Sequence, residues 1–228
     1  MNTNKFTFSR YASFFRWFAA VSMKNSLLTL SVIAAVAIVA GLVSSWSHFD
    51  SDGRIYAIIL FVAVGVAASL VLSPIDKQTV RQQFISIPAS HWEKFLAIFT
   101  LQIIMQALIV GIIAAADGLW AKSPGLFTFL EPFTIVGFWS MNYFIGTSIR
   151  KFPFLYGILV GASIYMTIIR QIKSLLGGED NVLLGFDNIG SKIFLAIMIV
   201  GMLLMSYHSF RKIRFNTVFF QHSNTGEL

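Results

Sequence analysis

Residues 27–46 read LLTLSVIAAVAIVAGLVSSW, a stretch with no charged side chain. A helix needs about 20 predominantly apolar residues to cross the hydrocarbon core of a bilayer. Further charge-free stretches of similar length follow at 55–72, 95–116, 132–149, 152–169 and 193–210. In lipid, a helix satisfies all of its backbone polar groups internally. The sequence therefore predicts an all-α membrane protein with six transmembrane helices.

The composition supports lipid as the solvent. Charged residues make up 12% of the chain, hydrophobic residues 56%, and the mean hydropathy is +0.74. A soluble domain carries about 25% charged residues. The net charge of +7 comes from Lys and Arg near the ends of the apolar runs, where membrane orientation rules place them, so no nucleic-acid partner is expected.

The basic residues are distributed unequally between the two sets of connections. One set holds Lys5, Arg10, Arg16, Lys24, Lys77, Arg81, Lys94, Arg150, Lys151, Arg211, Lys212 and Arg214, and the other holds Arg54, Lys122, Arg170, Lys173 and Lys192. Cytoplasmic connections carry the excess of Lys and Arg. Both termini are therefore predicted to be cytoplasmic, with 211–228 as a cytoplasmic tail.

Residues 1–26 are predicted to form an interfacial amphipathic helix ahead of the first span. One face would carry Phe8, Tyr11, Phe14, Phe15 and Phe18, and the other Ser9, Arg10, Ser13, Arg16 and Lys24. An aromatic face opposite a basic face is typical of a helix lying in the cytoplasmic interface of a membrane. The alternative is an ordinary basic flank with aromatic residues by chance.

The connection between the second and third spans contains two helix-start signals. Ser73-Pro74-Ile75-Asp76 offers a serine cap, a proline at the first helical position and a carboxylate, and the helix would end before Pro88. Ser90-His91-Trp92-Glu93 is a second capping box, which would open the third span. A short cytoplasmic helix with this much local definition indicates a docking site.

The connection between the fifth and sixth spans, 170–192, is apolar but interrupted by glycines. It is too apolar for a solvated loop and too broken for a span. We interpret it as a pair of short interfacial or re-entrant helices, buried against protein. A loop lying on the lipid headgroups is the alternative.

The sequence shows no set of catalytic residues, and an enzyme is not expected. The glycine-rich stretch 185–192 has its serine and lysine in the wrong order for a phosphate-binding loop. Without cysteine, disulfides and thiolate metal sites are excluded. The four histidines, His48, His91, His208 and His222, are scattered, so no metal site is predicted.

A few polar or small residues within the spans are candidates for function or packing. Gln102, Gln106 and Asn142 would bond between helices or line a path. Glu131 is either an intramembrane carboxylate or an interfacial residue at the start of the fourth span. Gly157 and Gly161 form a G-x-x-x-G helix-packing motif.

The whole arrangement resembles the transmembrane subunit of ABC-2-type transporters. The segment 87–95, IPASHWEKF, is similar to the LPAS-x-x-EKF pattern at the start of the third span in members from Bacteroidetes-like bacteria, with Ile87 in place of the usual leucine. The resemblance covers nearly the whole chain as architecture, while its sequence motif is short.

The resemblance implies a permease, an exporter in the inner (cytoplasmic) membrane, that does not itself hydrolyse ATP. Two permease subunits, identical or different, would pair, and each would bind a cytoplasmic ATPase that holds ATP and Mg²⁺. The coupling segment would be 76–87, with contacts from Asp76, Lys77, Arg81, Gln82 and Phe84. The alternative function is a non-transporting membrane anchor or regulatory subunit of a membrane complex.

Overall fold

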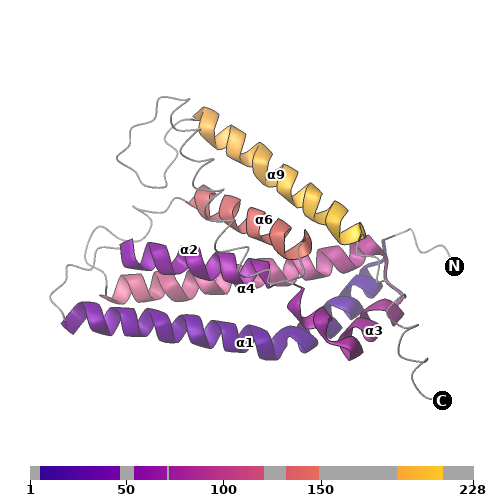
Figure 1. Ribbon diagram of the computed structural model, residues 1–228, viewed down its shortest axis with the longest axis horizontal. Helices are drawn as coiled ribbons and strands as arrows, with labels where there is room; N and C mark the ends of the chain where they lie inside the picture. Colours follow the sequence, from indigo (N-terminus) through magenta and orange to yellow (C-terminus); the bar gives the residue numbers. More distant parts are fainter. Residues whose placement is uncertain (1–5, 47–53, 71, 121–131, 149–188, 213–228) are drawn as a thin grey trace, which may run out of the picture.

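A computed structural model describes residues 6–46, 54–70, 72–120, 132–148 and 189–212. The elements in these ranges are helices (Figure 1). They are α1 (Phe8–Trp46), α2 (Arg54–Ser69), the 3₁₀ turn η1 (Ser73–Asp76), α3 (Gln78–Ser86), α4 (His91–Trp120), α6 (Pro132–Ser148) and α9 (Ile189–Lys212).

Within the described ranges, four helical segments are long and apolar enough to cross a membrane, so the chain is a helical membrane protein. They are Phe8–Val43, Ile55–Ile75, His91–Trp120 and Lys192–Arg211. The 17-residue α6 coincides with the predicted fourth span, 132–149. The predicted fifth span with Gly157 and Gly161, most of the outer segment 170–192, and Glu131 lie outside the described residues.

The helices run in two directions. α1 and α4 are parallel neighbours, since Arg10 contacts Glu93 near their first turns and Gly41 lies against Trp120 near their last turns. α2, α6 and α9 run the other way (Figure 1). Phe61 stacks on Phe138, and a Cβ on Gly146 would lie 2.5 Å from the carbonyl oxygen of Ser69, so α2 and α6 touch backbone to backbone.

The last turns of α6 and α9 also meet, because Ser148 Oγ donates to Ser209 Oγ at 3.0 Å. As a result, one end of the bundle holds the first turns of α1 and α4, the last turns of α2, α6 and α9, and all of α3 (Figure 1). We call this the α3 end. It collects the described segments that surround the predicted docking helix.

α1 is a single 39-residue helix, with no break at the predicted boundary near residue 26. Its length of about 58 Å is nearly twice the ~30 Å hydrocarbon core, so it extends well beyond a span. Phe14 and Phe18 of its aromatic face are buried in the protein core, whereas Phe8 is 72% exposed. The central residues of the predicted aromatic face therefore pack on protein.

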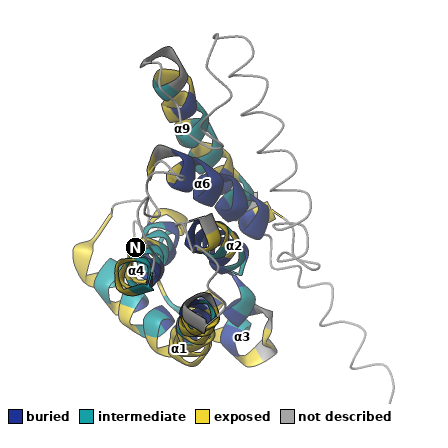
Figure 2. Cartoon of the chain, turned by 90° about the vertical axis from the view of Figure 1, so that its left-hand side faces the viewer, coloured by how far each residue is buried: buried dark blue, intermediate teal, exposed yellow. Residues whose placement is uncertain are grey.

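Burial differs strongly between helices (Figure 2). α6 is buried along most of its length, while α1 and α9 each leave an apolar face exposed. The exposed side chains include Val32, Val36 and Val39 of α1 and Ile197 and Leu204 of α9. Aliphatic side chains on an outer helical face suit contact with lipid.

The segment between α2 and α4 differs in part from its prediction. Residues 73–76 form the separate turn η1, which has no side-chain cap hydrogen bond, and Lys77 then adopts an extended conformation (φ −71°, ψ 129°) before α3. The single helix predicted to start at Ser73 is therefore two pieces. Its predicted end was correct, because Ile87 is extended ahead of Pro88, as the residue before a proline prefers.

Candidate functional site

α3 is attached to the bundle through one buried face. Phe84 is 3% exposed and Val80 is also buried. The Phe84 ring lies 5.4 Å from the ring of Phe14 on α1 and 6.3 Å from the ring of Phe210 on α9, both in edge-on geometry. These aromatic contacts fix the C-terminal half of α3 against two membrane-spanning helices.

Lys94, in the first turn of α4, adds a polar attachment. Its Nζ donates to the Phe84 carbonyl oxygen at 2.6 Å and lies 4.8 Å from the centre of the Phe84 ring. That carbonyl belongs to the last turn of α3, where the helix dipole is negative and a cation is stabilising. Lys94 is only 7% exposed, so its ammonium group contacts α3 rather than solvent.

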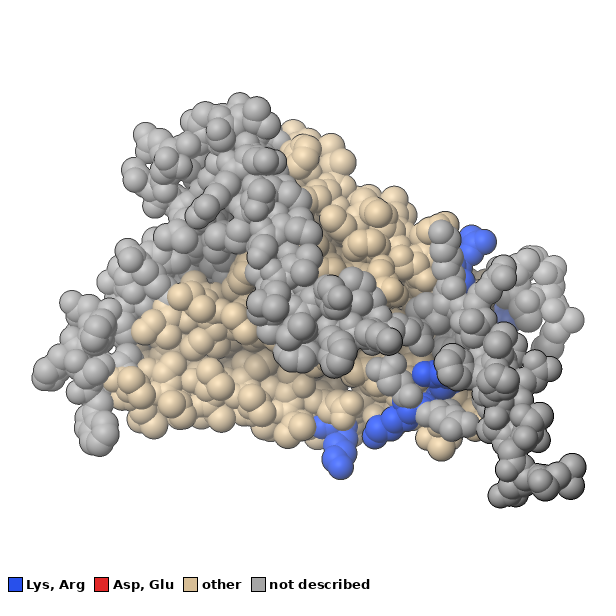
Figure 3. Space-filling view, in the orientation of Figure 1, with Lys and Arg blue, Asp and Glu red and all other residues tan. Residues whose placement is uncertain are grey.

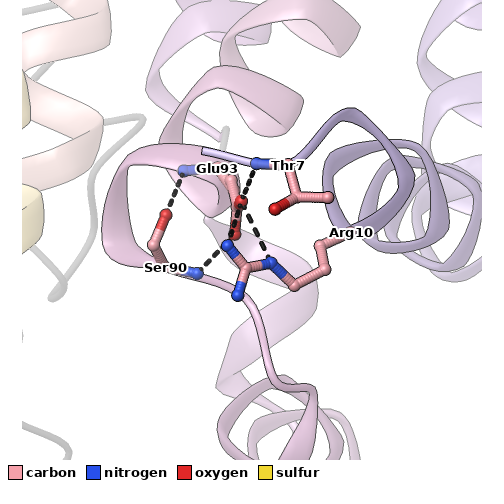
Figure 4. Close-up of polar contacts among 4 residues, drawn as sticks. All are labelled: Thr7, Arg10, Ser90 and Glu93. Atoms are coloured by element: carbon pink, nitrogen blue, oxygen red, sulfur yellow. Dashed lines mark hydrogen bonds and ion pairs between the residues drawn. The ribbon is translucent and has the colours of Figure 1, made fainter. Parts of the chain in front are cut away.

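Glu93, the preceding residue, is fully buried and joins α1 to α4 (Figure 4). Its carboxylate accepts hydrogen bonds from the backbone N–H of Ser90 and the backbone N–H of Thr7, each at 2.7 Å. The Arg10 guanidinium forms an ion pair with the same carboxylate at 3.0 Å. The Glu93 backbone N–H donates in return to Ser90 Oγ at 3.2 Å, which completes the predicted capping box.

One carboxylate thus serves two helix N-termini. Ser90 and Thr7 immediately precede α4 and α1, whose first N–H groups have no partner within their own helices. A negative charge placed there also complements the positive ends of both helix dipoles. Arg10 balances the charge of Glu93, so the buried carboxylate is paired and hydrogen-bonded.

The outer face of α3 remains exposed and has a distinct chemistry. Lys77, Thr79 and Gln82 are exposed, and Ile85 is a 51% exposed apolar residue among them. Arg81 is half-buried, with its Nε 3.5 Å from the Ile75 carbonyl oxygen. Figure 3 shows the described Lys and Arg side chains of one face of the molecule gathered towards the α3 end. The surface offers cations, amides and one aliphatic side chain, which suits docking of another protein.

The residues predicted to contact the ATPase differ in their exposure to solvent. Lys77 and Gln82 are exposed as docking contacts must be, and Arg81 is partly so. Phe84 is buried, so its proposed role as a contact is corrected to that of an anchor. Asp76 ends η1, and its side chain lies outside the described set.

The polar residues within the spans lie inside the bundle. Gln106 donates through Nε2 to the Val64 carbonyl oxygen of α2 at 3.3 Å, which makes it an interhelical link. Asn142 is fully buried and donates to Phe138 of its own helix. Gln102 lines a small pocket between α1, α4 and the end of α2.

The sequence interpretation missed the roles of Arg10 and Lys94. The available signal was the pair Glu93-Lys94 at the start of an otherwise apolar helix, since charges there must either face water or be paired. No group of three or more His, Asp or Glu that could hold a metal occurs within the described ranges. Comparison with protein-family models, curated proteins and solved structures gives no match to this chain.

Proposed function

We propose that this chain is the transmembrane permease subunit of an ATP-binding-cassette exporter of the ABC-2 type, in the inner membrane. The observation that carries the proposal is α3: a nine-residue helix held by buried polar and aromatic contacts, with a polar and basic face left exposed. A separate ATPase, binding ATP and Mg²⁺, would dock on that face. A second permease subunit would complete the transporter.

The anchors of α3 favour a mechanical role over a simple connection. An isolated helix of nine residues is marginal in water, so α3 depends on its tertiary contacts. Those contacts lead to α1 through Phe14 and to α4 through Lys94. A partner that moves α3 would therefore move two spans together, which is what an ATPase needs in order to drive a permease.

The directions of the helices support six crossings. α6 ends at the α3 end and α9 begins at the opposite end, although both run the same way. A chain that joins them has to pass from one end to the other. We propose that the predicted span 152–169 makes that crossing, which would bring the count to six and return the C-terminus to the side of the N-terminus.

The charges support a cytoplasmic α3 end. The described basic residues that lie nearer to it are Arg10, Arg16, Lys24, Lys77, Arg81, Lys94, Arg211 and Lys212, whereas Arg54 and Lys192 lie near the opposite end. Because the chain has no cysteine, single cysteines can report the orientation. Gln82→Cys should react with a membrane-impermeant maleimide in inside-out vesicles only, and Leu119→Cys in intact cells only. The reverse pattern would contradict the orientation.

The function is tested with the partner ATPase, which we expect to be encoded by a neighbouring reading frame. We expect it to co-purify with this chain, and Lys77→Glu to break the association while the chain stays in the membrane. Lys24→Glu is the matched control, since Lys24 is an exposed lysine of α1 rather than of the α3 segment. Equal retention of the ATPase by the two variants would contradict docking on α3. A partner that binds but shows no substrate-dependent ATP turnover would indicate the anchoring role instead.

A further inference from the structure

A small pocket of about 50 Å³ lies where α1, α4 and the end of α2 meet. Its polar lining comes from Ser22, Ser26 and Thr29 of α1 and Gln102 of α4, and its other lining residues include Met105 and Pro74. Pro74 belongs to η1, so the pocket lies directly beside the turn that leads into α3.

Two polar atoms in this lining are unusual. Ser22 is 5% exposed, and its Oγ and the Gln102 Oε1 are both buried without a hydrogen-bond partner among the described residues. Other buried serines bond back to their own helix, as Ser206 does to Met202 and Ser140 to Gly137. Because buried polar groups in proteins are almost always hydrogen-bonded, to protein or to ordered water, these two atoms call for a ligand.

The dimensions and chemistry of the pocket fit water. A pocket needs roughly 10–15 Å³ to hold one water molecule, and the water needs two to four polar partners. The available volume exceeds that requirement, and the Ser22, Ser26, Thr29 and Gln102 side chains offer both donors and acceptors. By contrast, a larger groove of about 480 Å³ between α1 and α2 is lined almost entirely by aliphatic residues, such as Val32, Ile58 and Val62, and suits a lipid chain.

We propose that ordered water occupies the pocket and bridges Ser22 of α1 to Gln102 of α4 beneath η1. The bridge gives Gln102 a defined role as a water-mediated interhelical link. It also leaves the joint between η1 and the bundle hydrated rather than tightly packed. The proposal stands independently of the transporter assignment.

The two methionines Met105 and Met141 allow a direct test. Both are buried, at 8% and 3% exposed, but only Met105 lines the pocket. X-ray-induced hydroxyl-radical footprinting of the full chain in lipid nanodiscs generates radicals from bound water, and a scavenger removes those formed in bulk. We expect Met105 to be oxidised several-fold faster than Met141. Equal or slower oxidation of Met105 would mean a dry or lipid-filled pocket and would overturn the proposal.

A variant tests whether Ser22 and Gln102 hold the water. In the double variant Ser22→Ala, Gln102→Leu, the oxidation of Met105 should fall to the rate of Met141, while the rate of Met141 stays unchanged and reports a retained fold. Undiminished oxidation of Met105 would show that Ser22 and Gln102 do not hold the water. If the variant does not fold, the measurement on the unaltered chain still decides whether water is present.

Discussion

The two turns that flank α3, residues 73–76 and 90–93, both begin with serine and end with a carboxylic acid, but they behave differently. At Ser90 the serine and Glu93 bond reciprocally and open α4. At Ser73 the backbone N–H already donates to the Leu70 carbonyl oxygen, and Ile75 N–H donates to Leu72. The first turn therefore continues the end of α2, and its serine has no free helix start to cap.

Of these two turns, the capping pattern forms only at the one where the chain has left the preceding element. Ile87, Pro88 and Ala89 separate Ser90 from α3, so the backbone there is free to begin a new helix. Glu93 then gains further partners in Thr7, just before α1, and in Arg10 of α1. At the second turn, the serine–glutamate capping pattern and the contacts with α1 both stabilise the same helix start. The first turn has neither a side-chain cap nor a free helix start.

The largest expected effect is at Glu93. Glu93→Ala leaves Arg10 without its carboxylate and Thr7 N–H without its acceptor, which should lower the free energy of unfolding by about 3 kcal/mol. Glu93→Gln, which keeps an acceptor oxygen, should cost less. Steric trapping in bicelles measures both values. An alanine variant within about 0.5 kcal/mol of the unaltered chain would show that the second turn is no stronger than an ordinary surface site.

A smaller loss is expected at Lys94, which extends the second turn's contacts to α3. Lys94→Met keeps much of the apolar stem but removes the donor to the Phe84 carbonyl oxygen, and we expect a loss of about 2 kcal/mol in the same assay. Lys24→Met is the control and should change stability by less than about 0.5 kcal/mol, since Lys24 is exposed. Equal effects of the two substitutions would show that Lys94 does not help to hold α3 against the bundle.

The smallest effects compare the two serines directly. Ser90→Ala removes a working cap and should cost about 1 kcal/mol. Ser73→Ala removes a serine that caps nothing, and should leave stability within about 0.5 kcal/mol of the unaltered chain. Thermal unfolding of the two variants in detergent, measured side by side, checks the order. A larger loss at Ser73 would reverse the interpretation of the two turns.

The membrane-spanning helices were largely predictable because lipid imposes one simple requirement, a long apolar run. The stretches that begin at 27, 55, 95, 132 and 193 all correspond to helices in the described ranges. The capping box at Ser90 and the stop before Pro88 were also predicted correctly, since both depend on local backbone chemistry.

The features that could not be predicted depend on contacts between residues far apart in the sequence. Arg10 and Glu93 are 83 residues apart, and no local pattern indicates that they meet. The aromatic face of residues 8–18 had two possible partners, lipid and protein, which have similar apolarity. The resemblance to ABC-2 permeases implied Phe84 as a contact of the coupling segment, but its ring fills the junction of α1, α3 and α9.

The central claim, that the exposed face of α3 receives an ATPase, is tested most directly by site-specific cross-linking. A single cysteine at Gln82, exposed on α3, should cross-link to the neighbouring-frame ATPase through a short bifunctional reagent, and cross-linking should change when ATP is hydrolysed. A cysteine at Val39, exposed on the apolar face of α1, should give no such product. No adduct from Gln82→Cys, under conditions in which the two proteins co-purify, would contradict docking at α3.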